Sequence, residues 1–432
     1  MDDASENAHR RETLRDDAGR VRQGWRTAFA SLGGLSVGPS PLTVMAFGVF
    51  APYLDQEFGW GIGATAFGAT ILSLMIMLLS PVQGLLIDRF GARPLILTSI
   101  PLFGFGYAAM ALLSGPLWQF YLAWILLPLL GIGLWPGSYL KATSSWFDRR
   151  LGLAIAVATV GIGIGGALFP ILIGTISEGQ GWRTAYAAVG LLSVAIAWPL
   201  AAIFIKDNPV IARSNAPGMA GAASGGWPEL RTADFWLLVA GFLLMGFVSS
   251  AMLVHQVSIL IDNGMARGSA VAIQSIVGLA TIAGRIGAGW MLDRLSVRIV
   301  MPLFAGAAAI AIGLFALGAT GGMAVICAMF VGLLIGAEID VLGYVVKRYF
   351  GTRRYGTLYG FLFSAFQLGG ALGVAALGMI RDSAGSYVPG LLALVVACGV
   401  ATVVFAILGP YRDGSARPGL AGAPSPEAAA NA

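Results

Sequence analysis

Four ionisable side chains lie deep within long apolar stretches of the sequence: His255, Arg285, Glu338 and Asp340. An apolar stretch of about 20 residues is long enough to cross a bilayer as a helix. A charge inside such a span is costly, and it marks a functional site by default. The sequence therefore predicts that these four residues carry much of the protein's chemistry.

Arg285 lies eight residues before Asp293, about 12 Å from that end of its helix at 1.5 Å per residue. A guanidinium keeps its charge and offers a carboxylate a fork of two donors. Arg285 is therefore a candidate substrate-binding residue for an anionic group. The alternative is an ion pair within the membrane, with Glu338 or Asp340 as the partner.

Glu338 and Asp340 are two positions apart, so on a helix they point about 200° from one another. Asp340 lies on a stripe of small and polar residues, whereas Glu338 lies among aliphatic ones. A carboxyl in apolar surroundings holds a proton near neutral pH, as proton coupling requires. Each acid is a candidate proton-coupling site. The alternative is a structural ion pair with Lys141, Lys347 or Arg285.

His255 lies one to two turns inside the outer end of its span, where it could bind substrate, relay a proton or form a local hydrogen bond. Polar and aromatic side chains in other spans are candidate cavity liners: Trp135, Pro136, Tyr139, Gln274 and Gln367. The sequence contains no metal-ligand cluster, phosphate loop or nucleophile–base pair. We therefore expect no metal, no cofactor and no enzymatic activity.

The elements that position these residues are apolar runs of span length. Of the 432 residues, 57% are apolar and only 11% are charged, whereas soluble domains have about 25% charged residues. The predicted fold is an all-α integral membrane protein with twelve transmembrane helices, at residues 27–54, 63–87, 94–114, 117–143, 151–176, 183–205, 235–261, 268–292, 298–318, 321–346, 355–380 and 386–410. Helix-breaking residues in the first run are expected to break or bend it at mid-depth: Gly33, Gly34, Gly38, Pro39 and Pro41.

The runs fall into two groups of six. We expect a cytoplasmic N-terminal tail (1–26), a first six-helix bundle (27–205), a cytoplasmic linker (206–232), a second six-helix bundle (233–410) and a disordered cytoplasmic tail (411–432). The linker and the last segment are rich in Gly, Ala and Pro, which is typical of segments that form no packed core.

The positions of Lys and Arg predict the orientation, because basic residues concentrate on the cytoplasmic side of a membrane. With a cytoplasmic N-terminus, all but four of the 26 basic residues lie in the termini or in cytoplasmic connections. The four exceptions are Arg183, Arg267, Arg381 and, within a span, Arg285. We therefore expect a multi-pass protein of a bacterial-type inner membrane with both termini in the cytoplasm. The same distribution explains the net charge of +5 without a nucleic-acid partner.

An internal repeat relates the two groups of runs. Gly84, Asp88, Arg89 and Arg93 recur 205 residues later as Gly289, Asp293, Arg294 and Arg298. Trp146-Phe147 and the arginines that follow recur as Tyr349-Phe350 and Arg353-Arg354, with one inserted residue. Ser80 corresponds to Arg285, so the fold does not require a charge there in both halves. Two pseudo-symmetric six-helix bundles can alternate access to a cavity between them, which favours transport.

The first repeated motif resembles the G-x-x-x-D-R-x-G-x-R signature of the major facilitator superfamily, and the resemblance covers nearly the whole chain. It implies a cytoplasmic conformational latch that favours an outward-open state. Asp88 would meet the N-terminus of a neighbouring helix, and the arginines would pair across the two halves. The expected latch residues are Asp88, Arg89, Arg93, Asp293, Arg294, Arg149 and Arg150. The alternative is that these residues only anchor the protein at the cytoplasmic side.

Within that superfamily, residues 146–161 resemble the entry to the fifth span of monocarboxylate transporters, Y-F-x-K-[RK]-[RL]-x-L-A-x-[GA]-x-A-x-A-G. The bacterial oxalate:formate antiporters are similar at this point. The resemblance implies that Arg285, as the eighth-span arginine, binds a substrate carboxylate. The family's D-G-G-W-G-W motif is present only as Gly24-Trp25, and its first-span lysine is absent. These departures argue against simple lactate-type proton coupling.

Together these features predict a secondary active transporter that moves a small organic anion, a monocarboxylate or an aromatic acid, by alternating access. We expect a proton as the coupling ion and a monomer in the lipid bilayer. Alternatives within transport are anion:anion antiport and export of a drug or of an uncharged compound such as a vitamin. A solute sensor that does not transport is an alternative from another class.

Overall fold

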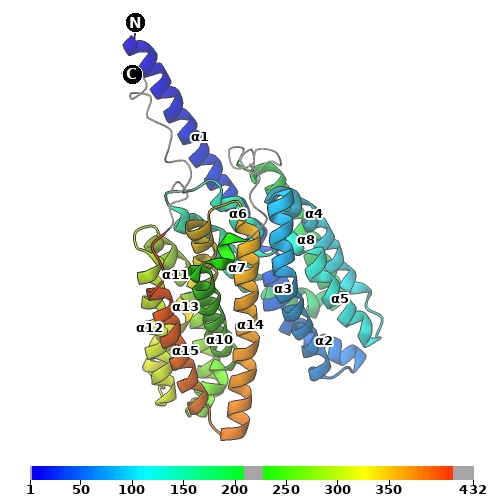
Figure 1. Ribbon diagram of the computed structural model, residues 1–432. Helices are drawn as coiled ribbons and strands as arrows, with labels where there is room; N and C mark the ends of the chain where they lie inside the picture. The colour runs from blue at the N-terminus through cyan, green and yellow to red at the C-terminus, as the bar shows by residue number, and fades with distance from the viewer. Residues whose placement is uncertain (1, 209–226, 412–432) are drawn as a thin grey trace.

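The computed structural model describes residues 2–208 and 227–411, and within these ranges every regular element is a helix (Figure 1). Most of the expected linker and nearly all of the expected C-terminal tail lie outside the described residues. The first half comprises α1 (Asp2–Ser36), η1 (Ser40–Met45), α2 (Phe47–Phe58), α3 (Ile62–Phe90), α4 (Ala92–Ala109), η2 (Met110–Leu112), α5 (Leu117–Leu130), η3 (Ile132–Leu134), α6 (Pro136–Ser144), α7 (Leu151–Gln180) and α8 (Trp182–Phe204). The second half comprises η4 (Pro228–Arg231), α10 (Ala233–Asp262), α11 (Arg267–Leu292), α12 (Val297–Ala316), α13 (Gly321–Phe350), α14 (Tyr355–Ala384) and α15 (Val388–Ala406).

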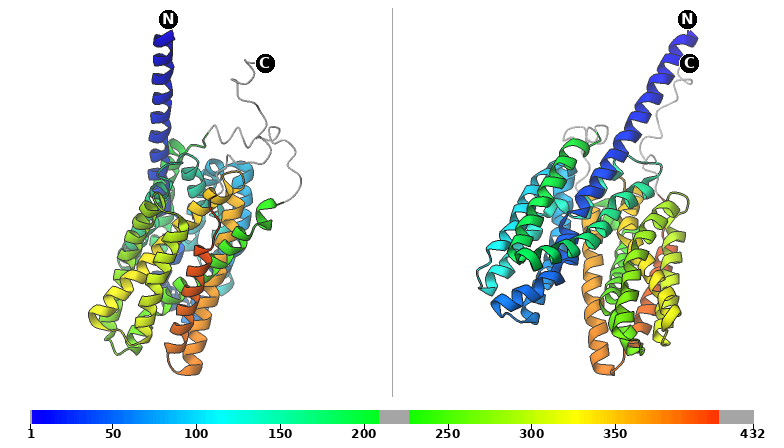
Figure 2. Two further views of the ribbon diagram at one scale, coloured as in Figure 1. Left: turned by 60° about the vertical axis from the view of Figure 1, so that its left-hand side comes forward. Right: turned by 180° about the vertical axis from the view of Figure 1, so that it is seen from behind.

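Twelve spans arise from these helices, as the sequence predicts. In the described ranges, ten helices are long and apolar enough to cross a membrane, and an eleventh span is a pair bent by 47° between Met45 and Phe47. The twelfth expected span begins with the shorter apolar helix α5, which η3 and α6 follow. The predicted tail 1–26 is helical from Asp2 onwards, and this part of α1 projects away from the bundle (Figure 2).

The first span is broken where the sequence predicts it. Regular α-helix ends at Ser36, and a π-helical turn follows the Gly38-Pro39 pair because proline lacks a backbone donor and cannot continue the α-helical pattern. Side chains of neighbouring spans satisfy the freed carbonyls: Ser193 donates to Val37 O at 2.7 Å and Tyr107 to Leu42 O at 2.9 Å. In lipid, such compensation is what permits a broken helix.

The fourth span is also broken, and the apolar run at 117–143 did not predict it. The α-helix α5 ends at Leu130, a short 3-10 turn follows, and α6 begins at Pro136 after the extended residue Trp135. Gln83 of α3 donates to Trp135 O at 3.2 Å, which fixes the break against a neighbouring helix. The break places the first turn of a helix inside the bundle.

The two halves contact each other at one end of the bundle, where α3, α6, α11 and α13 finish; we call it the Asp88 end. Hydrogen bonds between the described parts of the two halves fall within 77–88 and 144–153 of the first half and at Asp293 and 347–364 of the second. The ribbons lie together at this end and diverge towards the other (Figure 1).

Candidate functional site

The Asp88 end is held by two helix crossings that the repeat makes equivalent. In the first, α3 crosses α14 at Gly84 and Gly356, where a Cβ on Gly84 would overlap the Gly356 carbonyl oxygen. One turn further, Asp88 accepts hydrogen bonds from Gly356 N–H at 2.9 Å and from the N–H and hydroxyl of Thr357, both at 2.8 Å. The carboxylate therefore caps the N-terminus of α14, where the helix dipole favours negative charge. Lys141 of α6 also pairs with Asp88, at 2.6 Å.

In the second crossing, α11 meets α7 at Gly289 and Gly152. A Cβ on Gly152 would overlap the Gly289 carbonyl oxygen, so both crossings require glycine. Asp293 accepts from Gly152 N–H at 2.7 Å and from Leu153 N–H at 3.0 Å, which caps α7 as Asp88 caps α14. Each half therefore contributes an aspartate that caps a helix of the other half.

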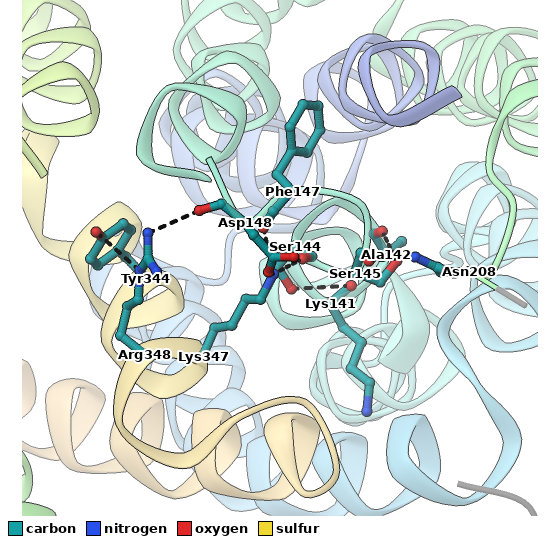
Figure 3. Close-up of polar contacts among 10 residues, drawn as sticks. All are labelled: Lys141, Ala142, Ser144, Ser145, Phe147, Asp148, Asn208, Tyr344, Lys347 and Arg348. Carbon is teal, nitrogen blue, oxygen red and sulfur yellow. Dashed lines mark hydrogen bonds and ion pairs between the residues drawn. The ribbon is translucent and has the colours of Figure 1, made fainter. Parts of the chain in front are cut away.

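A third contact joins α13 to the turn between α6 and α7 (Figure 3). The Lys347 ammonium donates to Ser144 O at 2.7 Å and to Phe147 O, and it pairs with the Asp148 carboxylate at 2.9 Å. Arg348 donates to Asp148 O at 2.9 Å. The hydrogen bond from Lys347 lowers the pKa of the Asp148 carboxyl below its ordinary value. Lys347 and Arg348 therefore bridge the halves, although the sequence did not place them in the latch.

The arginines expected to pair across the halves lie elsewhere in the structure. Arg93 donates to Ala202 O at 3.1 Å within the first half, and Arg294, just beyond the end of α11, donates to Trp290 O of that helix. Arg89 lies over the Phe90 ring, while Arg149 and Arg150 are exposed. The physical reason is their position: they stand on helix ends and turns beside the crossings, where carbonyls of their own half are nearer.

Arg285 of α11 forms a buried ion pair with Asp340 of α13. Arg285 Nη1 lies 3.0 Å from Asp340 Oδ1, and the two side chains are 5% and 1% exposed. Gly336 allows this approach, because a Cβ there would overlap the Thr281 carbonyl oxygen of α11. The pair is the alternative that the sequence left open for Arg285. The hydrogen-bonding capacity of the pair is not fully used, since Arg285 Nε and Asp340 Oδ2 have no partner within the described residues.

The ion pair faces the first half of the chain. Thr159, on α7, lies beside the Asp340 carboxyl. Tyr359, on α14, packs its ring against Gly137 of α6. Arg285 and Asp340 therefore lie where the two halves meet.

Glu338 faces a different helix from Asp340, in line with the angle between their positions. It is 2% exposed and accepts a hydrogen bond from the Ser249 hydroxyl of α10, inside the second half. The two acids of α13 thus have separate environments: Asp340 is paired with a cation, whereas Glu338 is bonded to a neutral hydroxyl.

Comparison with known families decides the class of the protein. The family model described as Major Facilitator Superfamily matches residues 33–374. The chain belongs to this superfamily. It is therefore a multi-pass membrane transporter, and its duplicated bundle is the fold that the superfamily's solved structures share.

Individual relatives in the superfamily are distant. The chain is 28% identical over 364 residues to an uncharacterised 38 kDa protein of Thermoproteus tenax, with 84% of this chain and 90% of that protein covered. It is 25% identical over 382 residues to human monocarboxylate transporter 11, with 85% and 79% covered. The solved structure of the superfamily transporter FucP in the outward conformation superposes with a TM-score of 0.70 and 15% identity, with 89% of this chain and 98% of that chain covered.

Other candidate residues of the transporter occupy separate places. His255 bonds Tyr387 Oη at 3.3 Å and Val374 O at 3.1 Å, which ties α10 to α14 and α15 within the second half. Gln367 is half-buried on α14. Trp135 and Tyr139 are buried, and their side-chain polar atoms have no partner in the described chain.

A cavity in the first half lies away from these residues. It measures about 340 Å³ and is lined mostly by apolar side chains of α4, η2 and α5 in the first half, among them Leu112 and Leu130, with Gln119 as a polar member. Its lining offers little for a polar solute to bind, whereas the ion pair retains Arg285 Nε and Asp340 Oδ2 without a partner within the described residues. We therefore place the candidate site at the ion pair rather than in that cavity.

Proposed function

We propose that the protein is a secondary active transporter that carries a small organic anion, a monocarboxylate or an aromatic acid, together with a proton. The observation that carries the proposal is the Arg285–Asp340 pair, which is buried, faces the opposite half and retains an unpaired donor and an unpaired acceptor. A relative that bears the name of a monocarboxylate transporter supports the same class of substrate.

The pair suggests how the two solutes are coupled. A buried arginine needs a counter-charge, because an uncompensated charge at this depth is strongly destabilising. Asp340 provides it in the empty transporter; once Asp340 takes up a proton, a substrate carboxylate provides it instead. The proton and the anion then enter together, and the net charge of the site stays unchanged. Glu338, bonded to Ser249, is the second candidate for the proton.

The latch sets the direction in which the site opens. The distribution of basic residues supports a cytoplasmic position for the Asp88 end, and the contacts between the halves gather at that end. These two features support the proposal that this is an outward-facing state, with both termini in the cytoplasm of a bacterial-type inner membrane. One chain supplies both halves of the site, so a monomer suffices.

A cysteine introduced at Arg89 is expected to react only from the cytoplasmic side of sealed cells.

Uptake into proteoliposomes tests the proposal. Labelled organic acids should accumulate in response to an imposed pH gradient, and Arg285→Lys should lose most of the affinity because it keeps the charge but not the fork. Asp340→Asn should abolish accumulation driven by the pH gradient, but the variant transporter should still exchange external substrate for pre-loaded substrate.

A double variant separates a substrate anchor from a structural pair. If the pair serves only the fold, Arg285→Gln combined with Asp340→Asn should recover carboxylate transport, and that recovery would overturn the proposal. Uptake that ignores the pH gradient but depends on an internal anion would replace the symport proposal with anion:anion exchange.

A further inference from the structure

A proline inside α3 frees one backbone carbonyl near the middle of that helix. Pro81 lies within α3 and has no N–H, so it cannot donate to Met77 O, which would be its acceptor in a regular α-helix. A carbonyl without a donor is costly inside a bilayer, where no water replaces the lost bond. Met77 O therefore needs a donor from a neighbouring helix.

The donor comes from the other half of the chain. The Ser364 hydroxyl of α14 donates to Met77 O at 2.6 Å. Gly360 permits this approach, because a Cβ there would overlap the Ser80 carbonyl oxygen of α3. Met77 precedes Asp88 by eleven residues, which is about 16 Å along the helix. The bond therefore joins the halves well inside the bundle, away from the helix cap at Asp88.

The second crossing lacks both partners of this bond. By the internal repeat, Ile286 of α11 stands in place of Pro81 and retains its N–H. Val160 of α7 stands in place of Ser364 and has no hydroxyl. The bond between α3 and α14 is thus an addition to one crossing and not a property of the repeated motif.

We propose that Pro81 and Ser364 form a conformational switch that stabilises the state in which the Asp88 end is closed. The two residues belong to opposite halves, and alternating access moves the halves against each other. When the Asp88 end opens, the Ser364 hydroxyl withdraws, and water that enters between the helices replaces it at Met77 O. The freed carbonyl holds the halves together only in the closed state, whatever the substrate or the coupling ion.

The switch predicts that one substitution acts differently in two backgrounds. Ser364→Ala leaves Met77 O unpaired in the closed state but not in the open state, so it should shift the equilibrium towards the open state by about tenfold. Pro81→Ala restores the N–H that bonds Met77 O within α3. In the Pro81→Ala background, Ser364→Ala should therefore shift the equilibrium by no more than about twofold.

A cysteine in place of Leu140 reports this equilibrium. Leu140 of α6 is 0% exposed and packs against Gly343 of α13 in the other half. The introduced thiol should therefore react with a water-soluble reagent only when the halves separate. The native Cys327 and Cys398 are 1% and 0% exposed, and each variant without the introduced cysteine gives the background. The measurement is the labelling rate of the purified transporter.

Ser80→Ala is the matched control. The Ser80 hydroxyl also donates to a carbonyl at 2.6 Å, but the acceptor is Ile76 O of the same helix, which the Ser80 N–H bonds as well in a regular α-helix. This variant should label at the wild-type rate. Ser364→Thr keeps the hydroxyl and should also stay near that rate, so the two changes at Ser364 decide the matter even if Pro81→Ala does not fold.

A faster labelling rate in Ser364→Ala that disappears in the Pro81→Ala background would support the switch. Labelling of Ser364→Ala at the wild-type rate would overturn it. An equal increase in both backgrounds would also overturn it, because the effect would then not depend on the freed carbonyl. An increase of the same size in Ser80→Ala or Ser364→Thr would show that the crossing responds to any change of side chain, and it would overturn the switch as well.

Discussion

The two helix crossings at the Asp88 end are alike in backbone and different in charge. Both bring glycine onto glycine, and both cap a helix with an aspartate from the opposite half. Asp88, however, also binds the Thr357 hydroxyl and the Lys141 ammonium. In the described chain, no lysine or arginine forms an ion pair with Asp293, and its two bonds come from backbone N–H groups.

The difference shows which part of the latch is duplicated. The close backbone approach and the helix cap are properties of the repeated motif, whereas the cation is an addition to one copy. At the same end, Lys347 and Arg348 hold the turn that leads into α7, so side chains of α13 support the second crossing in addition to its aspartate. We infer that the first crossing depends more on its aspartate than the second does.

The largest effect is expected from adding a methyl group at either crossing. Gly84→Ala and Gly289→Ala should each reduce transport to about a tenth or less, because the new Cβ has no room and must force the helices apart. Gly287→Ala on α11 is the control, since nothing lies within 4 Å of its Cβ position. Transport assays in proteoliposomes check this. Full activity of Gly84→Ala or Gly289→Ala would show that these crossings separate freely.

A smaller and unequal effect is expected from the aspartates. Asp88→Asn should slow turnover by roughly tenfold, because it weakens charge-assisted bonds and leaves Lys141 unpaired; Asp293→Asn should slow it less. Substrate affinity should change little in both, since the latch biases opening and not binding. Parallel measurements of turnover and of substrate Kd decide the matter. Equal losses in the two variants, or a loss of affinity as large as the loss of turnover, would contradict the comparison.

A modest effect is expected from Lys347→Met. The variant removes one ion pair and two bonds to backbone carbonyls, so a cysteine placed at the Asp88 end should become about threefold more accessible to a water-soluble thiol reagent. Asp148 is 94% exposed, and Asp148→Asn should change accessibility less. If Asp148→Asn changed cysteine accessibility as much as Lys347→Met does, the contact would be stabilised mainly by the ion pair and not by the hydrogen bonds to the carbonyls.

The smallest effect concerns pH. Lys347 lowers the pKa of Asp148, so this carboxylate stabilises the folded protein above its ordinary pKa of about 4 and the contribution is lost as pH falls through the lowered value. The Tm difference between the wild type and Asp148→Asn should therefore be small near neutral pH and vanish in acid. A difference that grows as the pH falls would contradict this sign.

Much of the fold follows from the sequence, because apolar length and helix breakers act locally. The break in the first span is predictable from Gly38, Pro39 and Pro41 within one run. The run that contains the second break also has local breakers, Gly131, Gly133 and Pro136, but they did not lead to a prediction. The hydrogen bond from Gln83 to the Trp135 carbonyl comes from another helix and has no local signal. Hydropathy reports that a segment is apolar, and it does not report where a neighbouring side chain compensates an irregular backbone.

The candidate site was predictable only in part for a similar reason. Burial cost alone singles out Arg285, Glu338 and Asp340, but the partner of each depends on helix packing across many residues. The sequence left the Arg285–Asp340 pair as one of several options. The role of Lys347 could not be inferred, because two of its acceptors are carbonyls of the α6–α7 turn, and backbone acceptors have no signature in a sequence.

The most direct test of the central claim counts the protons that accompany substrate binding. In weakly buffered solution, a bound organic anion should bring about one proton with it in the wild type and none in Asp340→Asn, because Arg285 then has no aspartate to release. Binding without proton uptake in the wild type, or undiminished proton uptake in Asp340→Asn, would contradict the exchange of Asp340 for a substrate carboxylate on Arg285.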